Sequence, residues 1–471
     1  MTKSSGRSTW GSVTEWAAAH QRSLTIGLFG FVGVLVVVAA AMVFGVLRDS
    51  PRTGTSPTGS AVPSPSASAS AAPSLEPTPD TASPTPLPSA SLSPGPTDAP
   101  PETLGDGWVE VGSFGSDDGI EAVYDVVEAP FGWLAAGVHI NTRQLPVFGP
   151  LSQVGRIWLS EDGRSWEDVT PSGGTFGDSS VYQLVALPDG AVAAFAQVSV
   201  LAEGDFDPVY AAWETTDGRT WTGSEISAGP GPVLNVAAGG AGYVTSRLVD
   251  AGETQLWHAS DGRNYAAVAD PTNGRIVTAM SAGPEGFVIL AEVYESAEPP
   301  TAYASANGTE WFEATSGAWD VGGVAPLGPD WVAIGSGPFD DEWRDTETSS
   351  WLSSNGLDWT DAGRIPLRAV PLSDGTLCRE FLSGPVSTGS LVVVSTTLSY
   401  PCGEGHVQRF GASHVTADGA TWTALPFTLE ASPGDDGTRG ATVNAGLDLG
   451  SGTLLVGEKD YRATFWFRPS D

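Results

Sequence analysis

Several acidic side chains lie in segments that read as long loops, and carboxylates in that number could bind a cation or a basic ligand. They are concentrated in the stretches "AEGDFDPVY" and "FDDEWRD". The six candidate binding residues are Asp205, Asp207, Asp340, Asp341, Glu342 and Asp345. A calcium site would need about six to eight oxygen atoms converging on one point, which scattered loops do not establish. A solvated acidic surface is the alternative, so we assign no metal and no cofactor and keep Ca²⁺ as a candidate.

Other patterns of residues that carry out chemistry are missing from the sequence. The five histidines have no zinc-ligand spacing, and there is no nucleophile elbow, phosphate-binding loop or CxxC pair. Two carboxylates facing each other could still cleave a glycosidic bond. The sequence therefore leans away from an enzyme and leaves a glycosidase as the enzymatic alternative.

A short sequence motif repeats along the part of the chain that contains these candidate residues. The stretch "IWLSEDGRSW" at 157–166 returns in five further near copies, and their central Asp-Gly or Asn-Gly pairs are 44 to 63 residues apart. Such a pair between two runs of aromatic and β-branched residues predicts a two-residue type I′ hairpin turn. The six pairs are Asp162-Gly163, Asp217-Gly218, Asp261-Gly262, Asn307-Gly308, Asn355-Gly356 and Asp418-Gly419.

Large rings occupy a fixed place after each turn. They are Trp166, Trp221, Tyr265, Trp311, Trp359 and Trp422. A ring at the same place on every hairpin would fill the gap to a neighbouring unit, since each buries about 150 to 250 Å². We therefore interpret these turns and rings as structural.

A second hairpin precedes each of these turns, which gives four strands per repeat. That pattern predicts an all-β fold, a β-propeller with four-stranded blades. The last segment, 440–468, supplies three strands, and "DGWVEVGSF" at 106–114 reads as a strand without a blade. Pairing the two would close the ring and remove exposed sheet edges. We predict seven blades, with six or eight as the alternatives.

The patterns "SEDGRSW", "TTDGRTW" and "SSNGLDW" resemble the Asp-box, or BNR, repeat of the sialidase-like β-propeller superfamily over residues 106–471. They lack the residue that the family has between Asp and Gly. The resemblance implies that the box is a turn between the third and fourth strands, on the face away from the active site. The arginine motif that sialidases carry before the first box has its counterpart, "GRIP" at 363–366, after the fifth, so Arg364 is expected at the surface.

The N-terminal part of the chain differs from the rest in composition. Residues 24–47 carry no charged side chain and exceed the roughly 20 residues needed to cross a membrane as a helix. A cleaved signal peptide is the alternative, although its apolar run would be shorter. Residues 48–105 are rich in Pro, Ser, Thr and Ala and predict a disordered stalk. We therefore divide the chain into a cytoplasmic tail (1–23), a transmembrane helix (24–47), the stalk (48–105) and a propeller domain (106–471).

Charge and cysteine content limit the partners and the compartment. The formal net charge of −34 excludes nucleic acid as a natural partner. The two cysteines, Cys378 and Cys402, are expected on the same face of one blade, so an exported domain would join them in a disulfide. Together with the apolar segment, they favour a single-pass protein of the cell membrane with its N-terminus in the cytoplasm and its propeller outside.

These features lead to one prediction of function and two alternatives. We predict a membrane-anchored binding module without catalytic activity, whose ligand is a glycan or a protein of the cell envelope. The long loops between the second and third strands of each blade would carry the site. A sialidase-like glycoside hydrolase and an assembly or scaffold factor remain the alternatives.

Overall fold

A computed structural model of the protein describes residues 103–470 except 117–118, 142–152, 173–174, 203–204, 225–232, 251–252, 294–299, 315–319, 337–347, 368, 372–376, 400–408, 411–412 and 428–440. The predicted tail, the predicted transmembrane helix and stalk residues 48–102 lie outside these residues. The last three residues assigned to the stalk form a short strand, β1 (Thr103–Gly105). Within the described ranges, the fold contains no helix with the length and apolar character needed to cross a membrane.

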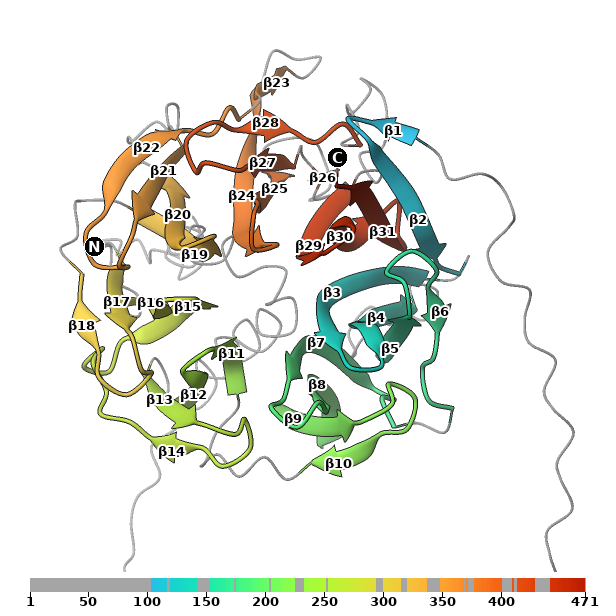
Figure 1. Cartoon of the computed structure of the whole chain (residues 1–471). Coiled ribbons are helices and arrows are strands. Elements are labelled where there is room, and N and C mark those ends of the chain that lie inside the picture. The colour runs from blue at the N-terminus through green and yellow to red at the C-terminus, as the bar shows by residue number, and fades with distance from the viewer. Residues whose placement is uncertain are drawn as a thin grey trace, which may run out of the picture.

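The strands form seven antiparallel sheets arranged in a ring (Figure 1). Blade 1 comprises β3 (Gly119–Ala129), β4 (Gly132–Asn141), β5 (Gln153–Ser160) and β6 (Glu167–Asp168). Blade 2 comprises β7 (Ser179–Ala186), β8 (Val192–Ala202), β9 (Asp205–Thr215) and β10 (Thr222–Ser224). Blade 3 comprises β11 (Val233–Gly239), β12 (Gly242–Asp250), β13 (Glu253–Ala259) and β14 (Ala266–Ala267). Blade 4 comprises β15 (Ile276–Gly283), β16 (Gly286–Glu292), β17 (Thr301–Ser305) and β18 (Phe312–Glu313).

In every blade the strands are named in order from the central channel outward, and three further blades complete the ring. Blade 5 comprises β19 (Asp320–Leu327), β20 (Asp330–Ser336), β21 (Thr348–Ser353) and β22 (Thr360–Arg364). Blade 6 comprises β24 (Leu377–Ser387), β25 (Val392–Ser399), β27 (His414–Thr416) and β28 (Thr423–Ala424), with the short strand β23 (Ala369–Pro371) paired to β24 and the short strand β26 (Arg409–Phe410) paired to β25. Blade 7 comprises β29 (Ala441–Leu449), β30 (Gly452–Lys459), β31 (Arg462–Pro469) and β2 (Trp108–Phe114), with β1 beyond β2.

The predicted fold class is confirmed for the described residues: the protein is an all-β propeller of seven four-stranded blades. The strand without a blade is β2, which pairs antiparallel with β31 in the register Val109 to Phe467. The two ends of the domain therefore meet in blade 7 (Figure 1). This pairing covers the edge that β31 would otherwise expose.

The hydrophobic core lies between successive blades. Trp166, the ring after the first Asp-box turn, stacks on Phe465 of blade 7 with ring centroids 4.3 Å apart. Both rings belong to one buried cluster with Trp158 of blade 1 and Leu449 of blade 7. Trp422 of blade 6 reaches blade 5 in the same way and donates a hydrogen bond from Nε1 to Ser350 Oγ at 3.1 Å. The box rings thus act as wedges that join one blade to the preceding blade.

The prediction that the Asp-box turns are type I′ hairpin turns is wrong. The six box glycines have φ between 70° and 73°, whereas Asp162 and its counterparts are not among the described residues with positive φ. Asp162 Oδ1 instead accepts hydrogen bonds from the backbone N–H groups of Arg164 (2.8 Å) and Ser165 (2.6 Å). The carboxylate closes a turn longer than two residues, as Asp side chains do when they bond to the backbone ahead of them.

Two constraints require glycine at the second position of the box. Gly163 has φ of 70°, and a Cβ atom there would lie 2.4 Å from Leu449 Cδ1 of blade 7. At Gly262 the equivalent contact is 2.6 Å from Leu187 Cδ2 of the loop between β7 and β8. Each box glycine therefore allows both the positive φ and the close approach of the neighbouring blade.

The arginines of the first three boxes also reach the preceding blade. Arg219 pairs with Glu167 at 2.6 Å, and Arg263 pairs with Glu214 at 2.8 Å. The guanidinium group of Arg164 lies over the ring of Phe467, 4.4 Å from its centroid. These contacts place the arginines on the face that carries the boxes, where they help to link adjacent blades.

Candidate functional site

The innermost strand of each blade carries an irregularity near its middle. In β3, for example, Val123 pairs with Gly137 and Asp125 with Ala136, so that Tyr124 has no partner on β4. The inner strands β7, β11, β15, β19 and β29 show the same one-residue shift in register, and β24 shows a longer irregularity between Leu382 and Pro385. Bulges of this kind redirect side chains. Seven such irregularities at one level therefore determine which side chains line the central channel.

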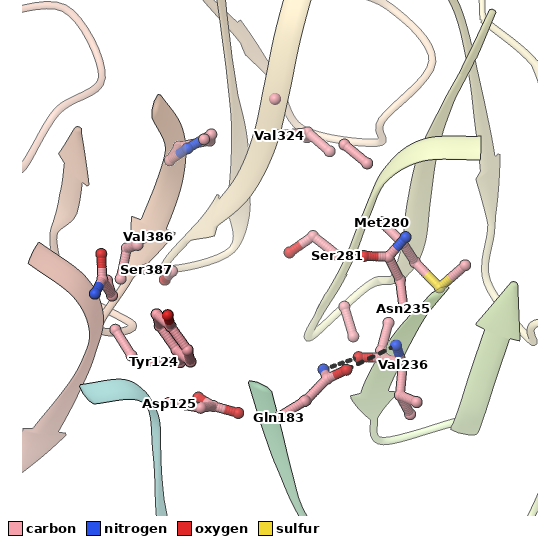
Figure 2. A pocket seen from close by; sticks show the side chains of 18 of the residues that line it. Tyr124, Asp125, Gln183, Asn235, Val236, Met280, Ser281, Val324, Val386 and Ser387 are labelled. Carbon is pink, nitrogen blue, oxygen red and sulfur yellow. Dashed lines mark hydrogen bonds between the residues drawn. The ribbon is translucent and has the colours of Figure 1, made fainter. Parts of the chain in front are cut away.

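A cavity of about 460 Å³ lies in the channel at the level of these bulges, and all seven inner strands line it (Figure 2). Its volume falls within the range of roughly 300–1,000 Å³ that ligand pockets have. One wall is polar and comes from blades 7, 1, 2 and 3. Its polar side chains are Asn444, Tyr124, Asp125, Tyr182, Gln183 and Asn235.

The opposite wall comes from blades 4 to 6 and consists mainly of small or apolar residues. These residues are Thr278, Ala279, Met280, Ser281, Ala282, Gly322, Gly323, Val324, Gly384, Pro385, Val386 and Ser387. Figure 2 shows Met280 and Ser281 across the cavity from Tyr124 and Asp125. The cavity therefore has a polar half and a mostly apolar half.

Polar side chains of the cavity wall also connect the blades. Asn444 of blade 7 donates from Nδ2 to the carbonyl of Val123 in blade 1 at 2.7 Å. Gln183 of blade 2 bonds the backbone of blade 3 twice: it donates to the carbonyl of Val236 and accepts the Val236 N–H at 3.0 Å (Figure 2). The residues at the position of Gln183 in blades 4 to 6 are Ala279, Gly323 and Pro385, whose side chains cannot form such bonds.

Asp125 is the lining residue with a carboxyl group, within the part of the chain that the structure describes. Its Oδ2 accepts the backbone N–H of Leu184 in blade 2, and its Oδ1 accepts that of Val126, both at 2.8 Å. Burial raises the pKa of Asp125 to about 7, although these two hydrogen bonds oppose the rise. The carboxyl group can therefore change its charge near neutral pH.

A second ionisable cluster lies beyond Tyr124, where blades 1 and 7 meet. Burial raises the pKa of the Tyr124 hydroxyl well above its ordinary range, and the nearby Glu458 carboxylate adds to the rise, while a hydrogen bond with Ser180 opposes it. Glu458 is itself buried in β30 and accepts the backbone N–H of Tyr461. Burial, with a smaller contribution from Asp460, raises the pKa of Glu458 from its ordinary value of 4.5 to about 8.

Replacing Glu458 with glutamine is expected to stabilise the protein increasingly as the pH rises above 4.5. Because the folded pKa lies above the unfolded one, the folded state keeps a proton that the unfolded state loses between pH 4.5 and 8, and stability falls as the pH rises through that window. Glu458→Gln should raise the free energy of unfolding by roughly 4–5 kcal/mol at pH 8.5 and change it little at pH 4.5. Chemical denaturation at both pH values measures the difference. The exposed control Glu313→Gln should have little effect at either pH, and a Glu458→Gln effect independent of pH would contradict the assignment.

At the end of blade 1 away from its Asp-box turn, Glu121 of β3 is buried beside His139 of β4 and Arg156 of β5. His139 Nδ1 lies 3.3 Å from Glu121 Oε1, and Arg156 NH2 lies 3.7 Å from the same atom. Burial raises the pKa of Glu121, and Arg156 and His139 oppose the rise. Across the described residues, no group of three His, Cys, Asp or Glu side chains is arranged to hold a metal ion.

Two of the acidic residues predicted from sequence lie in a strand, and the other four lie outside the described residues. Asp205 and Asp207 lie in strand β9, where they pair with Ala202 and Val200 of β8, so their expected place in a loop is wrong. Asp340, Asp341, Glu342 and Asp345 lie outside the described residues. Cys378 is in β24, opposite Val370 of β23, and Cys402 lies outside the described residues. The disulfide therefore stays a prediction.

The residues that line the cavity were not predicted from sequence, although a weak signal for them exists. Most inner strands begin their bulge after a valine, as in "VYDVV", "VYQLV", "VLNVA" and "VGGVA". The position after the bulge varies from Asp through Gln and Asn to Gly. This second repeat marks the channel-facing positions, just as the Asp-box marks the opposite edge of each blade.

Comparison with known proteins gives a likeness of fold. No family model matches the chain, and no curated protein matches it. A protein of unknown function from Dyadobacter fermentans is 15% identical, with a TM-score of 0.38 over 78% of this chain and 100% of its own. The β-propeller domain of the Trilobed protease from Pyrococcus furiosus is 10% identical, with a TM-score of 0.42 over 74% and 95%. A putative glycoside hydrolase from Parabacteroides distasonis is 10% identical, with a TM-score of 0.30 over 76% and 88%.

Proposed function

We propose that this protein is a membrane-anchored, extracytoplasmic binding module related to the Asp-box propellers, and that the central cavity binds a component of the cell envelope, a glycan or a protein segment. Residues 24–47 would form the single membrane span, and residues 48–102 would hold the propeller away from the surface. A disulfide between Cys378 and Cys402 would suit that compartment. The channel thus replaces the acidic loops as the proposed site.

The division of the cavity into two chemically different halves supports this proposal. A wall of convergent polar groups opposite an apolar wall is typical of sites that bind small ligands. Hydrolysis of a glycoside normally needs two carboxyl groups on either side of the bond. The described lining supplies one, Asp125, so binding accounts for the cavity better than hydrolysis does.

The full-length chain in mild detergent is expected to be retained on isolated envelope material, saturably and without turnover of aryl glycosides. Ser281→Trp should abolish retention, because Ser281 lines the cavity and an indole ring there would fill much of it. Thr222→Trp is the matched control, since Thr222 is exposed on the outer strand of blade 2. Equal retention of both variants would show that the cavity is not the site. Release of fluorophore would favour the hydrolase, and capture of a membrane protein independent of the cavity would favour the scaffold.

A further inference from the structure

The polar wall of the cavity carries one carboxyl group and no positively charged side chain among its described residues. Asp125 follows the bulge residue Tyr124 in β3, Tyr182 is the bulge residue of the adjacent inner strand β7, and all three line the cavity. Arg247 of β12 interacts with Tyr182 but does not line the cavity. Carboxylates and the faces of aromatic rings both attract cations.

The hydrogen-bonding capacity of this wall is mainly that of an acceptor. Each oxygen of Asp125 accepts one backbone N–H and keeps a second acceptor position. Tyr182 donates its hydroxyl to the carbonyl of Val233 at 3.1 Å, so its proton is already used. Gln183 has both ends of its amide bound to Val236. A ligand that brings its own N–H donors would fit these acceptors.

The charge of the whole chain acts in the same direction. A net charge of −34 gives the protein a field that attracts cations and repels anions. Met280, Val324 and Val386 on the opposite wall provide apolar surface for the carbon skeleton of a ligand. The cavity therefore suits a small organic cation better than a bare ion.

We propose that the cavity binds a small ligand through an ammonium group, with Asp125 as its counter-ion in the wall that Tyr124 and Tyr182 share. The inference rests on the proposed function, because it names the chemistry of the ligand in the same cavity. An amino sugar and an amine of a peptide side chain both supply this group.

Binding of an ammonium group to Asp125 is coupled to the release of a proton. The pKa of free Asp125 is about 7 because the carboxyl group is buried. The ionisable groups of the strands packed around it are Glu121, Tyr124 and Glu128 (β3), His139 (β4), Tyr182 (β7), Asp448 (β29), Glu458 and Lys459 (β30) and Arg462 and Arg468 (β31). None of them contributes to the shift, whose causes are burial and the two backbone hydrogen bonds. Affinity should therefore rise as the pH increases towards 7 and level off above it.

Calorimetry on the full-length chain tests the inference with two pairs of probes. The pairs are glucosamine with N-acetylglucosamine, and Nα-acetyl-lysine amide with Nα,Nε-diacetyl-lysine amide. At pH 7.5 the ammonium-bearing member of at least one pair should bind roughly thirtyfold more tightly than its acetylated partner. Its affinity should fall by up to about tenfold per pH unit below 7. The pair that shows this difference in affinity identifies the ligand as an amino sugar or as a peptide amine.

Asp125→Asn should remove the discrimination, whereas the exposed control Asp361→Asn should keep it. Because the asparagine amide cannot accept both backbone N–H groups, the pH dependence of the unmodified protein serves as an independent measurement. Equal affinity for charged and acetylated probes, or affinity independent of pH, would overturn the inference. If Ser281→Trp still loses envelope retention in that case, the cavity remains the binding site and only the ligand class is wrong. If neither variant affects retention, the proposed function fails as well.

Discussion

Trp166→Ala is expected to lower the free energy of unfolding by about 3–5 kcal/mol, the range for removal of a buried tryptophan. The side chain is 5% exposed and stacks on Phe465 across the interface between blades 1 and 7. Its Nε1 also donates to the carbonyl of Gly163 at 3.3 Å, which ties the ring to its own turn. Removing it leaves a cavity at the interface that closes the ring. Denaturant unfolding monitored by fluorescence and circular dichroism measures the loss.

Phe312→Ala provides the matched control for this prediction. Phe312 is also an aromatic residue close to a box turn, on the outer strand β18, but 60% of its side chain is exposed. Its removal should change the free energy of unfolding by about 0.5 kcal/mol or less. Similar losses for both variants would mean that the box rings do not act as wedges between blades.

The number of blades could be predicted because the Asp-box imposes its constraints locally. Gly163 and Trp166 lie within four residues of each other, and both are needed for contact with the preceding blade. A unit of this kind leaves the same kinds of residue at the same spacing in six of the seven blades, and sequence alone reveals it. The turn type was mispredicted for a related reason. An Asp-Gly pair favours a type I′ turn in isolation, but Asp162 bonds to two N–H groups ahead of it and closes a longer loop.

The cavity could not be predicted because its residues come together only when the ring closes. Asn444 and Val123 are far apart in the sequence, and yet the hydrogen bond between them joins the last blade to the first. The register shift that turns Tyr124 towards the channel depends on pairing with β4. Acidic residues such as Asp207 were more conspicuous in the sequence, but Asp207 lies in strand β9 of the second blade and not in a loop.

The residues of the polar wall have two roles, which explains why they differ from blade to blade. Asp125 and Gln183 bond to the next blade and also line the cavity. Where Gly323 and Pro385 take the same position, the side-chain link is absent and the wall is apolar. The two halves of the cavity wall therefore differ because this position, unlike the Asp-box, carries a different residue from blade to blade. This is the feature that a binding site, rather than the fold alone, would require.

Removal of β1 and β2 is expected to abolish the cooperative unfolding of the propeller. Trp108 on β2 is 1% exposed and packs against Phe427, with ring centroids 5.8 Å apart. Its ring also lies beneath the guanidinium group of Arg468, 5.0 Å from the ring centroid. A chain that begins at Gly119 would lose these contacts and expose the whole edge of β31, which could then pair with other chains.

The matched control begins at Thr103, so that it lacks the N-terminal segments but keeps both strands. We expect this control to unfold in one transition as a monomer, and the shorter chain to aggregate or to unfold without a transition in size-exclusion and thermal-melt measurements. A synthetic peptide of residues 103–116 should restore the transition of the shorter chain, because β2 pairs with β31 through backbone hydrogen bonds that a separate strand can also form. If the shorter chain instead unfolds at the same temperature as the control without the peptide, the pairing of the first strand with the last blade is not what holds the ring closed.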